Sequence, residues 1–148
     1  MRMDRLTTKS QEAMRAAVDE AVRAGNPELV PEHLLLAVLD QKDGIGAPLL
    51  ERAGAAPAAV RRDLEERLGT LPKVSGGEEP CLGRRAMALL QKAEDEAKAL
   101  KDVFVSVEHF VLAAAKSDKD LQTIFDRHGV SYKKLLAAMT QRPAELLR

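Results

Sequence analysis

An internal repeat is the feature that most constrains how this chain folds. Residues 30–37 read VPEHLLLA and residues 106–113 read SVEHFVLA, which places the second copy 76 positions after the first. Flanking matches at offsets of 76 and 75 join residues 19–21 to 95–97 and residues 49–54 to 124–129. Ordered matches on both sides of a motif indicate a duplicated unit of roughly 70 residues, because a surface loop tolerates a one-residue change of offset.

Each copy has the pattern of four helices. Apolar residues recur at spacings of three and four, and no segment alternates apolar and polar residues over a useful length. The expected helices are one capped by Thr7 or Thr8 and ended by Gly25, one that begins at Pro31, and then about 48–54, 57–68, 83–101, 106–115, 119–127 and 131–141. We therefore expect an all-α domain of eight helices, built as two four-helix repeats related by a pseudo-two-fold axis.

A segment without periodicity divides the two copies. Residues 70–80 contain Pro, Ser, Gly and Glu, which indicates a linker between a first repeat at 1–70 and a second at 81–142. One repeat alone has too little apolar core for comfortable stability, so the two are expected to pack into one domain. Pro143 is expected to end the last helix, and residues 143–148 to begin a connection to another part of a longer protein.

Composition excludes several classes of protein. The 148 residues include 23 basic and 23 acidic side chains, so the basic footprint of a nucleic-acid-binding protein is missing. No apolar run reaches membrane-spanning length, and no signal peptide is visible. Aromatic residues are only 3% of the chain, which favours helices packed through aliphatic side chains. The single cysteine, Cys81, excludes an internal disulfide and, with the other features, suggests a cytoplasmic protein.

The catalytic and metal-binding motifs with clear spacing rules are missing. The sequence contains no phosphate-binding glycine loop, no C-x-x-C and no H-E-x-x-H. His33 and His109 each follow a glutamate at equivalent positions, as a metal site or catalytic pair would require. The alternative is that Glu-His opens a buried helix, where the helix dipole favours the carboxylate, and it is preferred because a third zinc ligand is missing. His128 is expected to satisfy helix-end carbonyls, Cys81 to be a passive thiol, and no residue to be catalytic.

Residues 1–7, 31–37 and the degenerate second copy resemble the Clp N-terminal domain of bacterial AAA+ unfoldases. The start of the chain and the segment LPKV at 71–74 are most similar to ClpB-type disaggregases. The resemblance covers about residues 1–142. The resemblance implies a homohexameric parent whose separate modules bind ATP and magnesium. This segment is then expected to be a non-catalytic monomer without cofactor or metal. Its expected partners are unfolded or aggregated client proteins and adaptor proteins, but neither nucleic acid nor membrane.

The resemblance also implies where clients bind. The expected surface lies on the second repeat, before its buried helix. Its candidate polar residues are Thr7, Asp102 and Glu108, and its candidate apolar residues are Leu90, Val103, Phe104 and Phe110. The alternative for the four apolar residues is ordinary core packing. A transient client site needs an apolar groove rimmed by polar groups, which fits this composition.

ClpC-type relatives imply an alternative, in which the domain serves a Clp protease by docking adaptors or binding phosphoarginine. Thr7 and Glu32 are the candidates for a first phosphoarginine site, and Glu108 for a second. A helix N-terminus accepts phosphate and a carboxylate pairs with guanidinium. The residue 76 positions after Thr7 is Gly83, which weakens the second site. Because the two copies differ in sequence, any binding is expected to be unequal between the two repeats.

Overall fold

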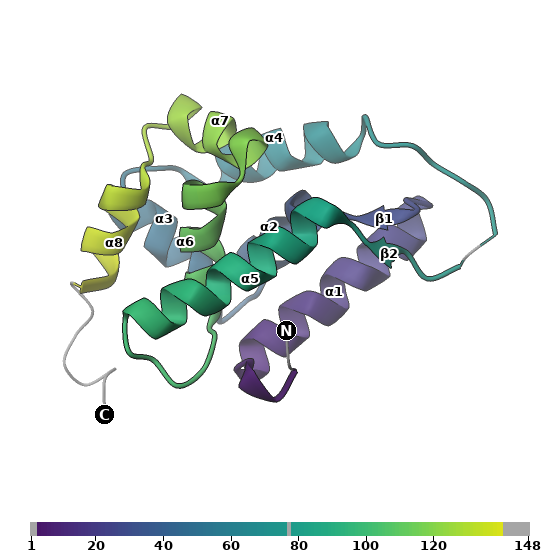
Figure 1. Ribbon diagram of the computed structural model, residues 1–148. Coiled ribbons are helices and arrows are strands. Elements are labelled where there is room, and N and C mark those ends of the chain that lie inside the picture. The colour runs from purple at the N-terminus through teal and green to yellow at the C-terminus, as the bar shows by residue number, and fades with distance from the viewer. Residues whose placement is uncertain (1–2, 77, 141–148) are drawn as a thin grey trace.

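The computed structural model describes residues 3–76 and 78–140, and within these ranges the chain forms eight α-helices (Figure 1). The first repeat contains η1 (Met3–Arg5), α1 (Thr8–Ala24), β1 (Glu28–Leu29), α2 (Pro31–Leu39), α3 (Gly46–Arg52) and α4 (Pro57–Leu68). The second contains β2 (Cys81–Leu82), α5 (Arg84–Ala99), α6 (Val107–Ser117), α7 (Lys119–Arg127) and α8 (Tyr132–Thr140). The all-α prediction is confirmed. Residues 143–148, expected to begin a connection, lie outside the described ranges.

Two short parallel pairings, which periodicity did not predict, join the repeats. Leu29 of β1 pairs with Leu82 of β2, and Leu6 pairs with Val105 in an isolated bridge. The two pairs are related by the repeat offset, since Leu6 corresponds to Leu82 and Leu29 to Val105. The segment before the first helix of each repeat therefore lies beside the central helix of the other, as pseudo-two-fold symmetry requires. Segments this short cannot show the alternation by which strands are recognised in a sequence.

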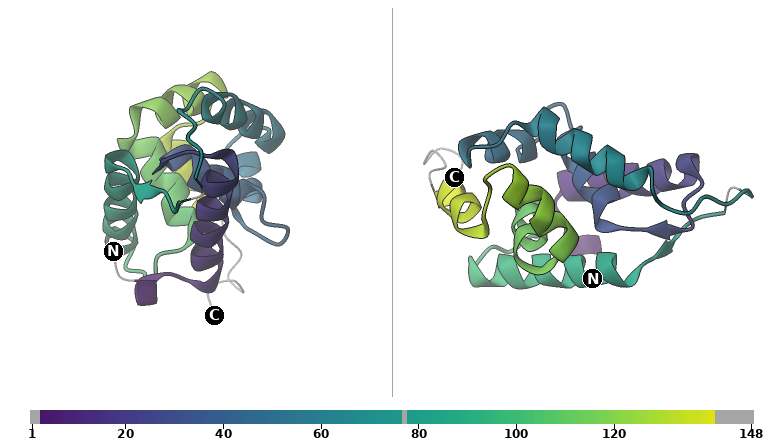
Figure 2. Two further views of the ribbon diagram at one scale, coloured as in Figure 1. Left: turned by 90° about the vertical axis from the view of Figure 1, so that its right-hand side faces the viewer. Right: turned by 90° about the horizontal axis from the view of Figure 1, so that it is seen from above.

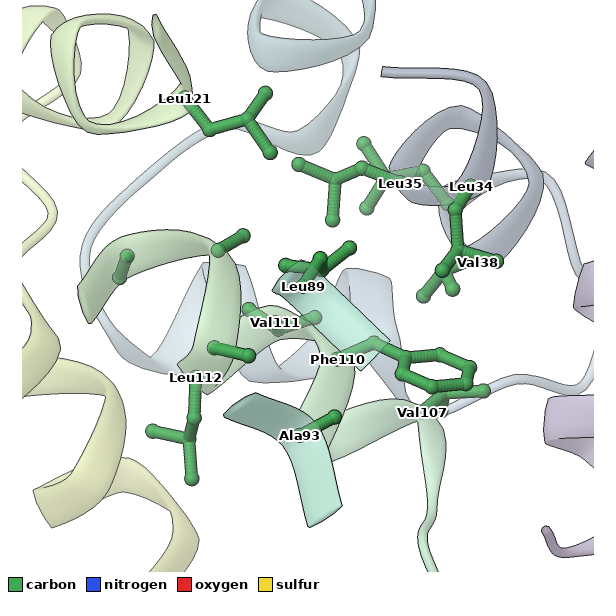
Figure 3. Packing of buried hydrophobic residues seen from close by; sticks show 14 of the residues in the cluster. Leu34, Leu35, Val38, Leu89, Ala93, Val107, Phe110, Val111, Leu112 and Leu121 are labelled. Atoms are coloured by element: carbon green, nitrogen blue, oxygen red, sulfur yellow. The ribbon is translucent and has the colours of Figure 1, made fainter. Parts of the chain in front are cut away.

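The central helices α2 and α6 form one core shared by both repeats. Every residue of α6 from Val107 to Ala115 is buried. Figure 3 shows Leu35 of α2, Leu89 of α5 and Phe110 of α6 converging on the same interior. In the left view of Figure 2, α1 and α5 lie at opposite sides of the molecule. The repeats bury their apolar helices against each other, as expected from the small core of each alone.

The linker is attached to the end of α1. Val74 donates its backbone N–H to the Gly25 carbonyl at 2.7 Å, and the Asn26 side chain donates to the Pro72 carbonyl at 3.1 Å. A side chain at Gly25 would place its Cβ 2.8 Å from the Val74 oxygen, so this contact needs glycine. Residues 70–76 and 78–80 lie at the end of the molecule far from α8 (Figure 1). Cys81, expected beside a flexible linker, is exposed in β2.

The helices α1 and α5 end in the same turn with different residues. After α1, Gly25 has φ 74°, and the Asn26 N–H donates to the Ala21 carbonyl at 2.9 Å. After α5, Lys101 takes this place with φ 61°, and the Asp102 N–H donates to the Ala97 carbonyl at 2.9 Å. The turn is the left-handed helix end that normally uses glycine, because a Cβ is strained there.

Replacement of Lys101 by glycine is expected to raise the free energy of unfolding by about 1 kcal/mol, because it removes the left-handed strain. Chemical denaturation measures the change. The control, Lys98→Gly inside the last turn of α5, is expected to lower stability by about 1 kcal/mol, since glycine disfavours a helix interior. A loss of stability in Lys101→Gly would show that the lysine is not strained.

Candidate functional site

The two repeated histidines are parts of helix starts. The Val30 N–H donates to His33 Nδ1 at 3.0 Å, and the Ser106 N–H donates to His109 Nδ1 at 2.8 Å. Because each Nδ1 accepts a backbone hydrogen bond, each Nε2 carries the proton, and His33 donates to Asn26 Oδ1 at 2.9 Å. Burial lowers the pKa of His33 below its usual 6.5, which favours this neutral form. Both ring nitrogens are engaged, so the Glu-His motif belongs to the structure of the helix start.

Asp102 serves the second histidine. His109 Nε2 donates to Asp102 Oδ2 at 2.8 Å, and Asp102 occupies the position of Asn26 in the first repeat. Its carboxylate therefore orients His109 and holds the loop before α6. Glu108, the other acidic candidate, is only 2% exposed. Neither carboxylate is a freely exposed binding group.

Thr7 caps α1 and lies beside the start of α6. Its Oγ1 accepts the Ser10 N–H at 3.1 Å, and its own N–H donates to the Val105 carbonyl at 3.1 Å. Ser10 also donates its hydroxyl to the Val105 carbonyl at 2.8 Å. The structure thus brings Thr7 to the helix that carries Glu108, and not to the start of α2 that carries Glu32.

The four apolar candidates divide evenly between surface and core. Val103 is 69% exposed and Phe104 is 50% exposed. Leu90 is 7% exposed and Phe110 is fully buried, so both are corrected to core positions. They lie on helix faces turned toward the shared interior, whereas Val103 and Phe104 lie in the loop that leads to α6. Met3, on the adjoining η1 turn, is also exposed, at 54%, and was missed.

The equivalent loop of the first repeat carries a carboxylate in place of the phenylalanine. Pro27 and Glu28 correspond to Val103 and Phe104. The Glu28 side chain packs over Gly83, and a Cβ at Gly83 would lie 2.4 Å from Glu28 Oε1. Gly83 corresponds to Thr7 of the first repeat. Because Gly83 has no side chain, the Glu28 side chain can lie where a residue such as threonine would clash with it. The apolar loop formed by Val103 and Phe104 is therefore found at one end of the pseudo-symmetric molecule only.

Glu32 is part of a buried ionic network, which corrects the expectation that it faces a partner. It is 2% exposed, and its Oε2 accepts from Arg67 Nε at 2.9 Å and from Arg85 Nη2 at 3.0 Å. Arg85 also forms a two-pronged pair with Asp118, at 3.0 and 2.9 Å. Burial by itself lowers the pKa of Arg85, but the hydrogen bonds to Asp118 and Glu32 outweigh it and raise the pKa above its ordinary value. The network ties α2 and α4 of one repeat to α5 and α7 of the other.

His128 has a different partner from the one expected. Its Nε2 lies 2.7 Å from Asp63 Oδ2 on α4, and Arg127 lies 3.1 Å from the same oxygen. The hydrogen bond from His128, more than any other contact, lowers the pKa of Asp63. His128 therefore joins the two repeats, which sequence spacing gave no means of predicting.

A hollow outside the expected site lies between α1 and α4, with α2 as its floor. This α1–α4 groove has a volume of about 540 Å³. Its lining residues are Glu12, Ala16, Glu20, Arg23, Ala24, His33, Leu36, Ala37, Asp40, Gln41, Arg61, Glu65, Leu68, Gly69 and Lys73. Only a position-by-position comparison of the two repeats, showing Ala24 opposite Leu100 and Arg61 opposite Leu136, contained a signal for it.

These features define a duplicated helical domain with an exposed apolar loop and an open groove. Among the described helices, none is long and apolar enough to cross a membrane. The chain belongs to the Clp repeat (R) N-terminal domain family, whose model matches residues 5–128.

Named relatives agree with this assignment. The chain is 42% identical over 136 residues to the chaperone protein ClpB of Mycobacterium bovis (strain ATCC BAA-935 / AF2122/97), covering 91% of this chain and 16% of that protein. It thus spans about one sixth of this relative's length. The fold is similar to the Hsp104 N-terminal domain from Candida albicans, with TM-score 0.76 and 22% identity over 92% of this chain and 89% of that one. It is also similar to a ClpV N-domain in complex with VipB peptide, with TM-score 0.76 and 20% identity over 93% and 86%.

Proposed function

We propose that this chain is the substrate-recognition domain of a ClpB-type ATP-dependent disaggregase, and that it transiently binds exposed hydrophobic segments of unfolded or aggregated proteins. The observation that carries the proposal is the apolar loop, where Val103 and Phe104 are exposed at the expected client surface. The similarity to ClpB supports the class of parent. ATP, magnesium and the hexamer belong to the proposed parent beyond this chain.

The size of the apolar loop suits transient binding. Full burial of a valine or phenylalanine side chain is worth about 1.5–3 kcal/mol. Val103 and Phe104 are already partly covered, so a client gains less from them than full burial gives. The cost of association removes part of that gain, which predicts weak binding that releases the client readily. Release is what a module that passes clients onward requires.

The geometry favours apolar clients over phosphoarginine. At the start of α2, Arg67 and Arg85 already bind Oε2 of Glu32, and the Glu28 carboxylate fills the space over Gly83, where it repels phosphate. At the start of α6, Thr7 is close, but Glu108 is buried. Phosphoarginine binding would therefore need rearrangement at either end, whereas the apolar loop is open as it stands.

The double variant Val103→Ser, Phe104→Ser tests the proposal. Reduced, carboxymethylated lactalbumin, a permanently unfolded chain, is expected to shift the amide resonances of residues 102–106 in the native protein. The variant is expected to bind about tenfold more weakly, because it loses apolar area, and to keep its stability within about 0.5 kcal/mol. Met87→Ser, which removes an equally exposed side chain from α5, is the control and should bind normally. Unchanged binding by the double variant would refute the assignment.

A further inference from the structure

The region of the second repeat that corresponds to the α1–α4 groove carries larger apolar side chains. There, Leu100, Tyr132 and Leu136 pack against the core from the end of α5 and from α8. The corresponding residues of the first repeat are Ala24, Pro57 and Arg61, at the repeat offsets of 76 and 75. Replacement of large apolar side chains by alanine, proline and arginine leaves apolar surface without a cover.

A polar cluster completes the closure in the second repeat. Tyr132 donates its hydroxyl to Glu96, which is only 3% exposed. Lys116 Nζ lies 3.7 Å from Glu96 Oε2 and 4.6 Å from the centre of the Tyr132 ring. Burial, with the bond to Glu96, raises the pKa of Tyr132 to about 12, so the hydroxyl keeps its proton. The Tyr132 ring and the Lys116 side chain together cover Glu96 in the second repeat.

One charge of the open groove differs in sign from its counterpart in the second repeat. Glu20 and Asp40 line the groove, and they correspond to Glu96 and Lys116. A carboxylate therefore stands where the second repeat has its lysine. The charged lining groups are the carboxylates of Glu12, Glu20, Asp40 and Glu65 against the basic groups of Arg23, Arg61 and Lys73. Arg61 pairs with Asp40 at 2.6 Å and with Glu65 at 2.7 Å, and Arg23 pairs with Glu20. The lining still has one more carboxylate than basic groups, so the groove favours one further positive charge.

We propose that the α1–α4 groove binds an amphipathic helix of a partner protein that presents leucine or tyrosine side chains beside a lysine or arginine. Such a helix supplies from outside what the second repeat supplies from its own chain. The lining follows α1 from Glu12 to Ala24, which is about 18 Å, or three turns of a helix. Side chains at i, i+4 and i+7 of a partner helix reach along such a groove. The site is separate from the apolar loop, so it does not depend on the proposed client binding.

Two matched helical peptides test the proposal. Each has about 14 residues, stabilised as a helix, with Leu, Tyr and Leu on one face; the first carries Lys beside this face and the second carries Glu. Fluorescence anisotropy with the full chain measures affinity, and NMR shifts identify the surface. We expect the lysine peptide to bind with shifts at Ala16, Leu36 and Ala37, and the glutamate peptide to bind at least about tenfold more weakly.

Substitutions on α1 complete the test. Ala16 lines the groove and is exposed, so Ala16→Trp fills it without disturbing the core and is expected to weaken the lysine peptide at least about tenfold. Arg15→Trp, on the same helix outside the groove, and the Val103→Ser, Phe104→Ser variant should bind normally. Equal affinity for the two peptides, shifts confined to the apolar loop, or no binding by the native chain would each overturn the proposal, and none of these results would contradict the proposed client binding.

Discussion

Replacement of Phe110 by alanine is expected to lower the free energy of unfolding by about 3–5 kcal/mol, because it empties a large space in a core that both repeats share. Phe110 is fully buried on α6, and Figure 3 shows it among side chains of α2 and α5. Most domains are stable by only about 5–15 kcal/mol, so the variant approaches the limit of folding. Denaturant titration followed by circular dichroism measures the loss.

Phe104 provides a matched control six positions earlier in the sequence. It is 50% exposed, so Phe104→Ala leaves no cavity and is expected to change stability by about 0.5 kcal/mol or less. The pair separates a core phenylalanine from a surface one in a chain that has only three. Equal losses in the two variants would mean that the loop before α6 packs against the core after all.

Replacement of Arg85 by alanine is expected to cost about 2 kcal/mol, because it removes a partner from carboxylates that are buried. Glu32 and Asp118 have side chains 3% and 8% exposed, and both bind Arg85. Loss of one member of a fully buried pair costs about 3–5 kcal/mol, and the value here is smaller because the Arg85 side chain is 34% exposed and Arg67 still holds Glu32. Chemical denaturation of the full chain measures this loss too.

Arg84→Ala removes a neighbouring exposed arginine and should change stability by no more than about 0.5 kcal/mol. Adding Glu32→Gln to Arg85→Ala should restore part of the loss, because it removes the buried charge left with fewer partners. Additive effects of Arg85→Ala and Glu32→Gln would show that the two residues are not coupled, and that this ion pair does not stabilise the contact between the repeats.

Local pattern was sufficient for the helices. The spacing of apolar residues and the prolines and glycines at helix ends predicted α4 and α7 with the bounds observed, since these signals act within one or two turns. The short strands were missed, because each is formed by partners more than fifty residues away along the chain. Lys101 was predicted as the last residue of its helix, but its left-handed conformation was not, since glycine normally signals that conformation.

The candidate site was predictable only in part. The sequence located the loop before α6, and there the structure exposes Val103 and Phe104. It did not separate these from Leu90 and Phe110, because all four are apolar residues near one another in the same repeat. It placed Glu32 toward a partner, whereas Arg67 and Arg85 reach it from α4 and α5. Ion pairs between distant helices have no local pattern that predicts them.

By itself, the sequence determined the duplication, the helices and the apolar residues of the two central helices, because periodicity and repetition are properties of the chain. The tertiary structure alone decided which equivalent positions became different surfaces. The swapped pairing of Leu6 with Val105 brought Thr7 to α6, and Glu28 came to cover Gly83. The two Glu-His helices read alike in the sequence, but packing between repeats left the apolar loop at one end and the open groove in the first repeat. Exposure depends on what the rest of the fold places against a residue, and that is set only when the repeats pack together.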